Sequence, residues 1–215
     1  MIVKAISNKK NRDITINKFY PVIIKKDDDI RIVDDFSGLS IYEIQDFQVY
    51  KSNISSYVKD INSLIYELVD YPTFLEDYYN DDKEARDGVA SSQLNILEED
   101  LNTEELIKLI TSEIYSCDEK IIFIKAIENK MTDKSAKLLA DYFLTKYEAD
   151  PELLLPICIL LSKYQNQEVY DLFLKYISDE TIDNEFVQNI IVDYFNNYDF
   201  KKTITQLIEE LVIHN

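Results

Sequence analysis

Apolar residues in the second half of the chain recur at an interval of 33 positions, and this period constrains the fold more than any other feature of the sequence. A first helical stripe, spaced i, i+3, i+4, i+7, i+8 as on an amphipathic helix, comprises Ala136, Leu139, Ala140, Phe143 and Leu144. Adding 33 to each number gives Val169, Leu172, Phe173, Tyr176 and Ile177. The next stripe shifts in the same way, from Leu154, Ile157, Cys158 and Leu161 to Val187, Ile190, Ile191 and Tyr194. Helix pairs that repeat at such a period are typical of an α-solenoid.

The repeat extends less regularly beyond these two units. An earlier unit begins near Leu106, which lies 33 residues before Leu139, but its second helix around Ile124 falls a few residues out of register. A last helix near Leu207 is also offset. An ordinary helical bundle with helices of similar length is the alternative. The matched apolar positions favour the repeat, so we expect a mainly α protein, an α-solenoid of helical repeats behind a small β module. The resemblance given below implies that these repeats are HEAT-like.

The first fifty residues follow a different pattern. Short runs rich in Ile, Val, Phe and Tyr alternate with turn residues every 8–12 positions, which is typical of β-strands. Pro21 indicates an edge strand or a bulge, because proline cannot donate a ladder hydrogen bond. From residue 53 the pattern becomes helical, with a predicted apolar stripe of Ile54, Val58, Ile61, Ile65 and Leu68. We therefore expect a small five-stranded β-barrel module over residues 1–52 and a helical-repeat domain over residues 53–215.

The chain is strongly acidic, with 41 Asp and Glu against 23 Lys and Arg and a formal net charge of −18. The excess is concentrated in residues 60–105, where fourteen acids face only Lys83 and Arg86, whereas residues 1–26 carry a net charge of +6. An acidic body repels nucleic-acid phosphates and attracts basic proteins. We therefore expect a basic protein partner and no direct nucleic-acid binding. A charged surface that only keeps the protein soluble is the alternative.

Residues that carry most enzymatic chemistry at neutral pH are scarce. His214 is the single histidine, Cys117 and Cys158 lie far apart within helical patterns, and the two glycines cannot form a phosphate-binding loop. The run Asp27-Asp28-Asp29 lacks the downstream Gly and Glu of a calcium-binding EF-hand loop. We expect a protein that is not an enzyme and has no catalytic residue, cofactor or metal site. The alternative is an enzyme that uses only carboxylates and tyrosines.

The sequence also bears on the cellular location. It contains no run of about 18 apolar residues that could span a membrane, and residues 1–13 lack the apolar segment of a secretory signal. The two cysteines fit buried free thiols in a reducing compartment. We therefore expect a cytoplasmic protein that makes no membrane contact.

The segment 70–84, DYPTFLEDYYNDDKE, combines tyrosines with carboxylates. Tyrosine supplies rigid contact area at interfaces, and carboxylates attract a basic partner. We therefore predict a partner-binding surface formed by Glu76, Asp77, Tyr78, Tyr79, Asp81, Asp82, Glu98, Glu99 and Asp100. The alternative is a short connecting helix that packs two of its rings into the core.

The first fifty residues also resemble a known module. The residues that carry the resemblance are Lys18-Phe19-Tyr20-Pro21-Val22, Ile30-Arg31-Ile32-Val33-Asp34-Asp35, Ser37-Gly38, Ile41-Tyr42 and Asp46-Phe47. They resemble the SH3-like β module that precedes helical domains in bacterial immunity proteins. The helical remainder is similar in kind to the HEAT-like half of some immunity proteins of contact-dependent inhibition systems. The resemblance implies an intracellular antidote that binds one secreted toxin domain, often a basic nuclease, and blocks its active site.

These expectations lead to two hypotheses for function. The first is an immunity protein that binds a cognate basic toxin domain, expected to be a nuclease, as a one-to-one complex and occludes it. The second is a helical-repeat scaffold or adaptor for another cellular or phage partner. A toxin-domain gene directly upstream of the gene for this chain would favour the first hypothesis.

Overall fold

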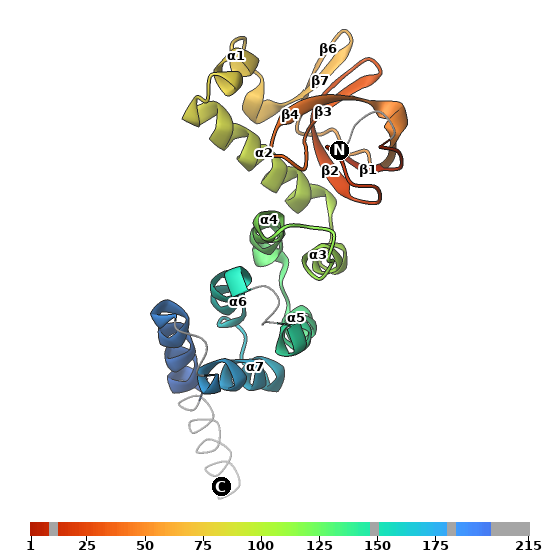
Figure 1. Cartoon of the computed structure of the whole chain (residues 1–215). Helices are drawn as coiled ribbons and strands as arrows, with labels where there is room; N and C mark the ends of the chain where they lie inside the picture. Colours follow the sequence, from red (N-terminus) through yellow and green to blue (C-terminus); the bar gives the residue numbers. More distant parts are fainter. Residues whose placement is uncertain (9–12, 147–150, 180–183, 199–215) are drawn as a thin grey trace, which may run out of the picture. The chain divides into compact units, whose positions relative to one another are not determined.

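The computed structural model describes residues 1–8, 13–146, 151–179 and 184–198. The chain divides into two compact units, and each is described by itself (Figure 1). The first unit comprises Met1–Glu105 and Ser112–Tyr115, and the second comprises Leu106–Thr111 and Ser116–Asn215. The predicted last helix near Leu207, and with it His214, lies outside the described residues.

An antiparallel sheet forms the centre of the first unit. Within the described residues its seven strands are β1 (Ile2–Ala5), β2 (Phe19–Lys26), β3 (Asp29–Val33), β4 (Leu39–Glu43), β5 (Phe47–Lys51), β6 (Tyr57–Asp60) and β7 (Ser63–Tyr66). The strand order is β4-β3-β2-β1-β5, and β7 pairs with both β2 and β6. The strands predicted in the first fifty residues are thus present, because their β-branched and aromatic side chains pack well on a pleated surface.

β2 is the central strand of this sheet. Its first half pairs with β1, and its second half pairs with β3 and β7. The register between β2 and β3 shifts between Val22 and Ile24, directly after Pro21. This irregularity agrees with the bulge that the proline indicated, since a proline interrupts the hydrogen-bond ladder of a central strand.

The sequence prediction is wrong for residues 53–68. The helical stripe expected there consisted of Ile54, Val58, Ile61, Ile65 and Leu68. Instead, β6 and β7 form a hairpin whose turn is Ile61-Asn62, so the β structure extends to Tyr66 rather than ending at residue 52. Periodicity over so short a segment cannot separate helix from strand. The pairing of β7 with β2, a strand distant in the sequence, decides the outcome.

Two helices complete the first unit, α1 (Phe74–Tyr79) and α2 (Lys83–Asp100). Asp82 caps α2, because its carboxylate accepts a hydrogen bond of 3.0 Å from the backbone nitrogen of Ala85. A Cβ atom added at Gly88 would lie 3.4 Å from Cγ1 of Val69. The glycine therefore marks where α2 passes close to the short 3-10 helix η2 (Glu67–Val69).

Helices make up the second unit. They are α3 (Thr103–Ile110), which carries the chain into this unit, α4 (Cys117–Ile127), α5 (Asp133–Lys146), α6 (Leu154–Leu161), α7 (Gln167–Ser178) and a helix over residues 185–198. α5 packs against α7, and α4 packs against α6. α4 begins with a capping box, in which Ser116 and Glu119 each accept a hydrogen bond from the backbone nitrogen of the other.

The first four positions of each 33-residue-related stripe on α5 and α7 are buried. Ala136, Leu139, Ala140 and Phe143 and their counterparts Val169, Leu172, Phe173 and Tyr176 are each no more than 2% exposed. The last position of each stripe is not fully buried, since Leu144 is half-buried and Ile177 is exposed. Asn166, which caps α7, donates through Nδ2 to Oδ1 of Asp133 at 2.9 Å, across the same interval. In the described part of the chain, no helix has both the length and the apolar character needed to cross a membrane.

Candidate partner-binding surface

The nine residues predicted to contact a partner fall into two groups at opposite ends of α2. The first group lies on α1 and in the turn that follows it, up to Asp82. The second group, Glu98, Glu99 and Asp100, forms the last turn of α2. At the helical rise per residue, about 25 Å of helix separates Asp82 from Glu99. The structure therefore does not bring the nine residues together as one patch.

Tyr78 is buried, and its side chain is used inside the first unit. Tyr78 is 4% exposed, and the centroid of its ring lies 6.2 Å from that of Phe74. The guanidinium carbon of Arg86 lies 4.2 Å from the centroid of the Tyr78 ring. The Tyr78 hydroxyl donates to the carbonyl oxygen of Ser37 at 3.4 Å. Tyr78 thus anchors α1 to the sheet, as the alternative of a ring-packing connecting helix anticipated. It does not belong to the contact set.

Tyr79, its neighbour, is 58% exposed. Its hydroxyl donates to the carbonyl oxygen of Leu39 at 2.9 Å and accepts from Nη1 of Arg31 at 2.8 Å. These two bonds fix the ring at the edge of β4 while one of its faces stays accessible. Tyr79 therefore keeps its place in the predicted contact set as an ordered aromatic group.

The acidic group at the end of α2 fastens that helix to the sheet. The Asp100 side chain is 2% exposed, and its Oδ2 lies 3.1 Å from the α-ammonium nitrogen of Met1, which also donates to the hydroxyl of Tyr57 at 3.0 Å. Burial lowers the pKa of this ammonium, and the Asp100 carboxylate opposes the shift. Glu99 accepts from Oγ of Ser56 at 2.9 Å. The Asp100 side chain is inaccessible to a partner, so we remove Asp100 from the predicted contact residues. The contacts of Glu98 and Glu99 with a partner remain a prediction.

Accessible carboxylates remain on and after α1. Glu76, Asp81 and Asp82 are exposed, and Asp77 is half-buried. Asp81 has a positive φ of 59° and forms an ion pair with Arg86. Asp82 is committed to its capping bond, so a substitution there would also weaken α2. Glu76 is therefore the position at which the charge can be changed with the least structural cost, whereas a change at Asp81 also removes its ion pair with Arg86.

Sequence reasoning missed a groove on the outer face of the sheet, because it assigned β6 and β7 to a helix. Cross-strand pairing aligns one residue from each of β4, β3, β2, β7 and β6, namely Ile41, Arg31, Ile24, Ile65 and Val58. We call these five residues the aliphatic row. Ile41 and Val58 are 54% and 43% exposed. Four of the five, all but Val58, line a groove together with Leu75 of α1, and the volume of this groove is about 720 Å³.

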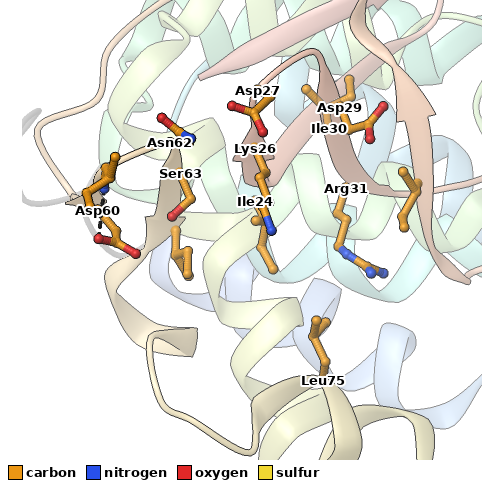
Figure 2. Close-up of a pocket in the computed structure, with 13 residues that line it drawn as sticks. Ile24, Lys26, Asp27, Asp29, Ile30, Arg31, Asp60, Asn62, Ser63 and Leu75 are labelled. Atoms are coloured by element: carbon orange, nitrogen blue, oxygen red, sulfur yellow. Dashed lines mark hydrogen bonds between the residues drawn. The ribbon is translucent and has the colours of Figure 1, made fainter.

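A second row lies two residues further along each of these strands. It comprises Glu43, Asp29, Lys26, Ser63 and Asp60, which we call the acidic row. Because side chains alternate between the faces of a strand, both rows share the outer face. Figure 2 shows Asp27 and Asp29 at one end of the groove and Leu75 at the other. The groove therefore presents aliphatic side chains directly beside carboxylates.

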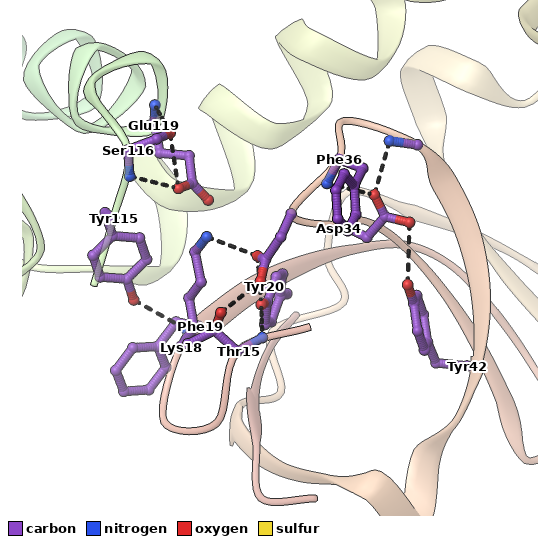
Figure 3. A network of polar contacts seen from close by, with 12 residues as sticks. Thr15, Lys18, Phe19, Tyr20, Asp34, Phe36, Tyr42, Tyr115, Ser116 and Glu119 are labelled. Carbon is purple, nitrogen blue, oxygen red and sulfur yellow. Dashed lines mark hydrogen bonds and ion pairs between the residues drawn. The ribbon is translucent and has the colours of Figure 1, made fainter. Parts of the chain in front are cut away.

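The two aspartates that follow β3 have structural roles (Figure 3). Asp34 accepts hydrogen bonds from the backbone nitrogens of Phe36 and Gly38 and from the hydroxyls of Ser40 and Tyr42, at 2.6–3.1 Å. Asp35 accepts from Thr15 and Tyr20 and pairs with Nζ of Lys18, at 2.6–2.8 Å. Burial alone would raise the pKa of Asp35, but these three donors outweigh it and lower the pKa. The network leaves Phe36 77% exposed at the tip of an ordered turn.

The chemistry available elsewhere in the described residues is limited. They contain no group of three or more His, Cys, Asp or Glu side chains arranged to hold a metal ion. Cys117 and Cys158 are thiols rather than a disulfide. Burial raises the pKa of the Cys158 thiol, which keeps it protonated and unreactive.

Comparison with known proteins identifies no relative. No protein family, no curated protein and no solved structure matches this chain. The resemblance to immunity proteins therefore rests on the short motifs of the first fifty residues and on the helical type of the remainder.

Proposed function

We propose that the protein is an inhibitor that binds a basic partner protein as a one-to-one complex, and that this partner is a toxin domain, expected to be a nuclease. One observation carries the proposal. Exposed carboxylates gather on and after α1, including Glu76, Asp81 and Asp82, in a chain whose net charge is −18. A body of this charge attracts a cationic surface and speeds its encounter with it.

Inhibition of this kind needs no chemistry from the inhibitor. A nuclease holds the phosphates of its substrate with Lys and Arg side chains. Carboxylates that pair with those side chains exclude the nucleic acid from them. Close charge pairs at a protein interface can each couple by about 1.5–7 kcal/mol, so a few such pairs suffice for tight binding.

The second unit is, in this proposal, an α-solenoid of HEAT-like repeats. Support comes from the buried stripes related by 33 residues, from the packing of α5 on α7 and of α4 on α6, and from the Asn166–Asp133 hydrogen bond. A solenoid presents an extended surface on which a partner can lie. The same architecture supports the second candidate function, a scaffold or adaptor for another cellular or phage partner.

Protection from a toxin is the direct test. The gene directly upstream is sequenced first. If it encodes a toxin domain, the chain is co-expressed with that domain, and cell growth, nuclease activity and the mass of the purified complex are measured. We expect restored growth, blocked nuclease activity and a one-to-one complex. A complex that leaves the nuclease active would favour the scaffold hypothesis instead.

Charge reversal tests the proposed surface. Glu76→Lys combined with Asp81→Lys should slow association with the basic partner by about tenfold at low salt, because both carboxylates are exposed and contribute to steering. The matched control is Asp141→Lys with Glu152→Lys, which makes the same change in charge at exposed positions of the second unit. Stopped-flow association at two salt concentrations provides the rates. A larger effect of the control pair would place the contact on the second unit, and rates that respond to neither salt nor substitution would refute electrostatic recognition.

A further inference from the structure

The aliphatic row is unusual for the outer face of an antiparallel sheet. Such a face normally carries polar side chains when it is exposed to water. Here Ile41 is 54% exposed, Val58 is 43% exposed and Ile61, in the adjoining hairpin turn, is 94% exposed. Ile24 and Ile65 lie half-buried between the first two. Apolar side chains gathered in a groove of about 720 Å³ are typical of a binding site rather than of a solvated surface.

The acidic row gives one end of this groove a negative charge. Glu43, Asp29 and Asp60 are exposed carboxylates, and Lys26 is the one cation among the five residues of that row. Asp27 adds a further carboxylate at the same end of the groove. Arg31, the cation within the aliphatic row, keeps its charge and donates to the hydroxyl of Tyr79 at 2.8 Å. Three carboxylates (Asp27, Asp29 and Asp60) and two cations (Lys26 and Arg31) line the groove, so its carboxylate end favours a ligand that combines aliphatic groups with positive charge.

We propose that the groove binds an extended segment of the basic partner, with an aliphatic side chain on the aliphatic row and a Lys or Arg two residues away on the acidic row. The two rows are separated by two residues of strand, or about 6.6 Å. An extended segment that runs along the strands places its own residues i and i+2 at that same spacing and on one face. The inference rests on the proposed function in one respect, the positive charge of the partner.

Charge complementarity also selects this occupant over the alternatives. A second copy of the chain carries the same carboxylates and a net charge of −18, so two copies repel one another. A purely apolar small molecule would leave the acidic row without a counterpart. A segment that alternates aliphatic and cationic side chains satisfies both rows at once.

The test uses the full chain with isotope-labelled isoleucine methyl groups and synthetic peptides as probes. The first peptide repeats Ile-Ser-Lys-Ser, the second Ile-Ser-Glu-Ser and the third Ser-Ser-Lys-Ser. We expect only the first peptide to shift the methyl signals of Ile24, Ile41 and Ile65 in a saturable manner. Equal shifts with the third peptide, shifts confined to other isoleucines, or no shifts at all would overturn the inference, as would self-association of the chain without peptide.

Variants locate the binding to the groove. Ile41→Lys with Ile61→Lys, at two exposed positions that line the groove, should weaken binding of the first peptide by about tenfold or more, because apolar contact is replaced by like charge. Both positions are exposed, so the fold should tolerate the change. Val49→Lys on β5 is the matched control, since Val49 is 45% exposed and does not line the groove. Equal loss of binding in the control would overturn the assignment.

The same variants separate this inference from the proposed function. If Ile41→Lys with Ile61→Lys leaves the toxin-domain complex unchanged while Glu76→Lys with Asp81→Lys slows its formation, the groove inference fails and the proposed function stands. If the first peptide binds the groove but the chain neither binds the toxin domain nor protects against it, the proposed function fails and the groove stands as a site for a different basic segment.

Discussion

Carboxylates in this protein serve two purposes that a count of charges cannot separate. Asp34, Asp35 and Asp100 are held by donors within the first unit, and they fix turns and a helix end. Glu76 and Asp29 are exposed instead. Fewer carboxylates are therefore accessible to a partner than the net charge suggests.

Asp35→Asn should reduce the loss of stability in acid. The pKa of Asp35 in the folded protein lies below its usual value of 3.8, so its charged form favours folding. This stabilisation is present above the unfolded pKa and is lost as the pH falls through the folded pKa. Between about pH 5 and about pH 3, the free energy of unfolding from urea titrations should fall more for the wild type than for the variant. Asp28→Asn, at an exposed carboxylate, is the control and should follow the wild type, and identical slopes for all three proteins would exclude this role for Asp35.

At the scale of elements, the β6–β7 hairpin has the largest consequence. Its two strands add Val58 and Ile65 to the aliphatic row and Asp60 and Ser63 to the acidic row. Without the hairpin, the second half of β2 would lack the neighbouring strand that β7 provides, because β1 pairs only with the first half. The groove is therefore a property of strand pairing rather than of any single segment of sequence.

The two glycines should respond in opposite ways to substitution by alanine. At Gly88 within α2, an added Cβ meets only ordinary contact, 3.4 Å from Cγ1 of Val69, so Gly88→Ala should stabilise the protein by about 0.5–1 kcal/mol through helix propensity. At Gly38, an added Cβ would lie 3.3 Å from both Oδ2 of Asp34 and Oγ of Ser40. The Ser40 hydroxyl donates a hydrogen bond to that Asp34 oxygen. Gly38→Ala should therefore destabilise by about 1–3 kcal/mol. Urea unfolding measures the change in free energy of both variants. If Gly88→Ala destabilises the protein, Val69 of η2 cannot move far enough to accommodate the added methyl group.

For the molecule as a whole, the net charge of −18 acts on folding and on binding in opposite directions. Like charges repel within the compact state, whereas opposite charges attract a partner. The groove and α1 belong to the first unit, and the buried stripes of α5 and α7 belong to the second. Salt screens both effects, so its influence on the free chain and on the complex should differ in sign.

Salt should stabilise the free chain. Raising ionic strength from about 0.01 M to about 0.15 M shortens the screening length from about 30 Å to about 8 Å and weakens the internal repulsion. The midpoint of thermal unfolding should rise over this range, whereas association with the basic partner should slow. Measurements with sodium chloride and with potassium chloride would separate screening from specific ion binding. A midpoint that falls with both salts would mean that attractive pairs such as Lys18–Asp35 dominate the electrostatics of folding.

The sequence by itself determined the elements whose signal is local. The strands of the first fifty residues and the helices α5 to α7 follow from side-chain periodicity, and most positions of the predicted stripes, such as Phe143 and Tyr176, are buried. Tertiary structure alone decided what depends on distant partners. The β6–β7 hairpin needed β2, Tyr78 and Asp100 were buried by contacts with Ser37 and Met1, and the groove needed five strands in register. Periodicity indicates which face of an element is apolar. Whether another element covers that face, and which one, depends on how the whole chain packs.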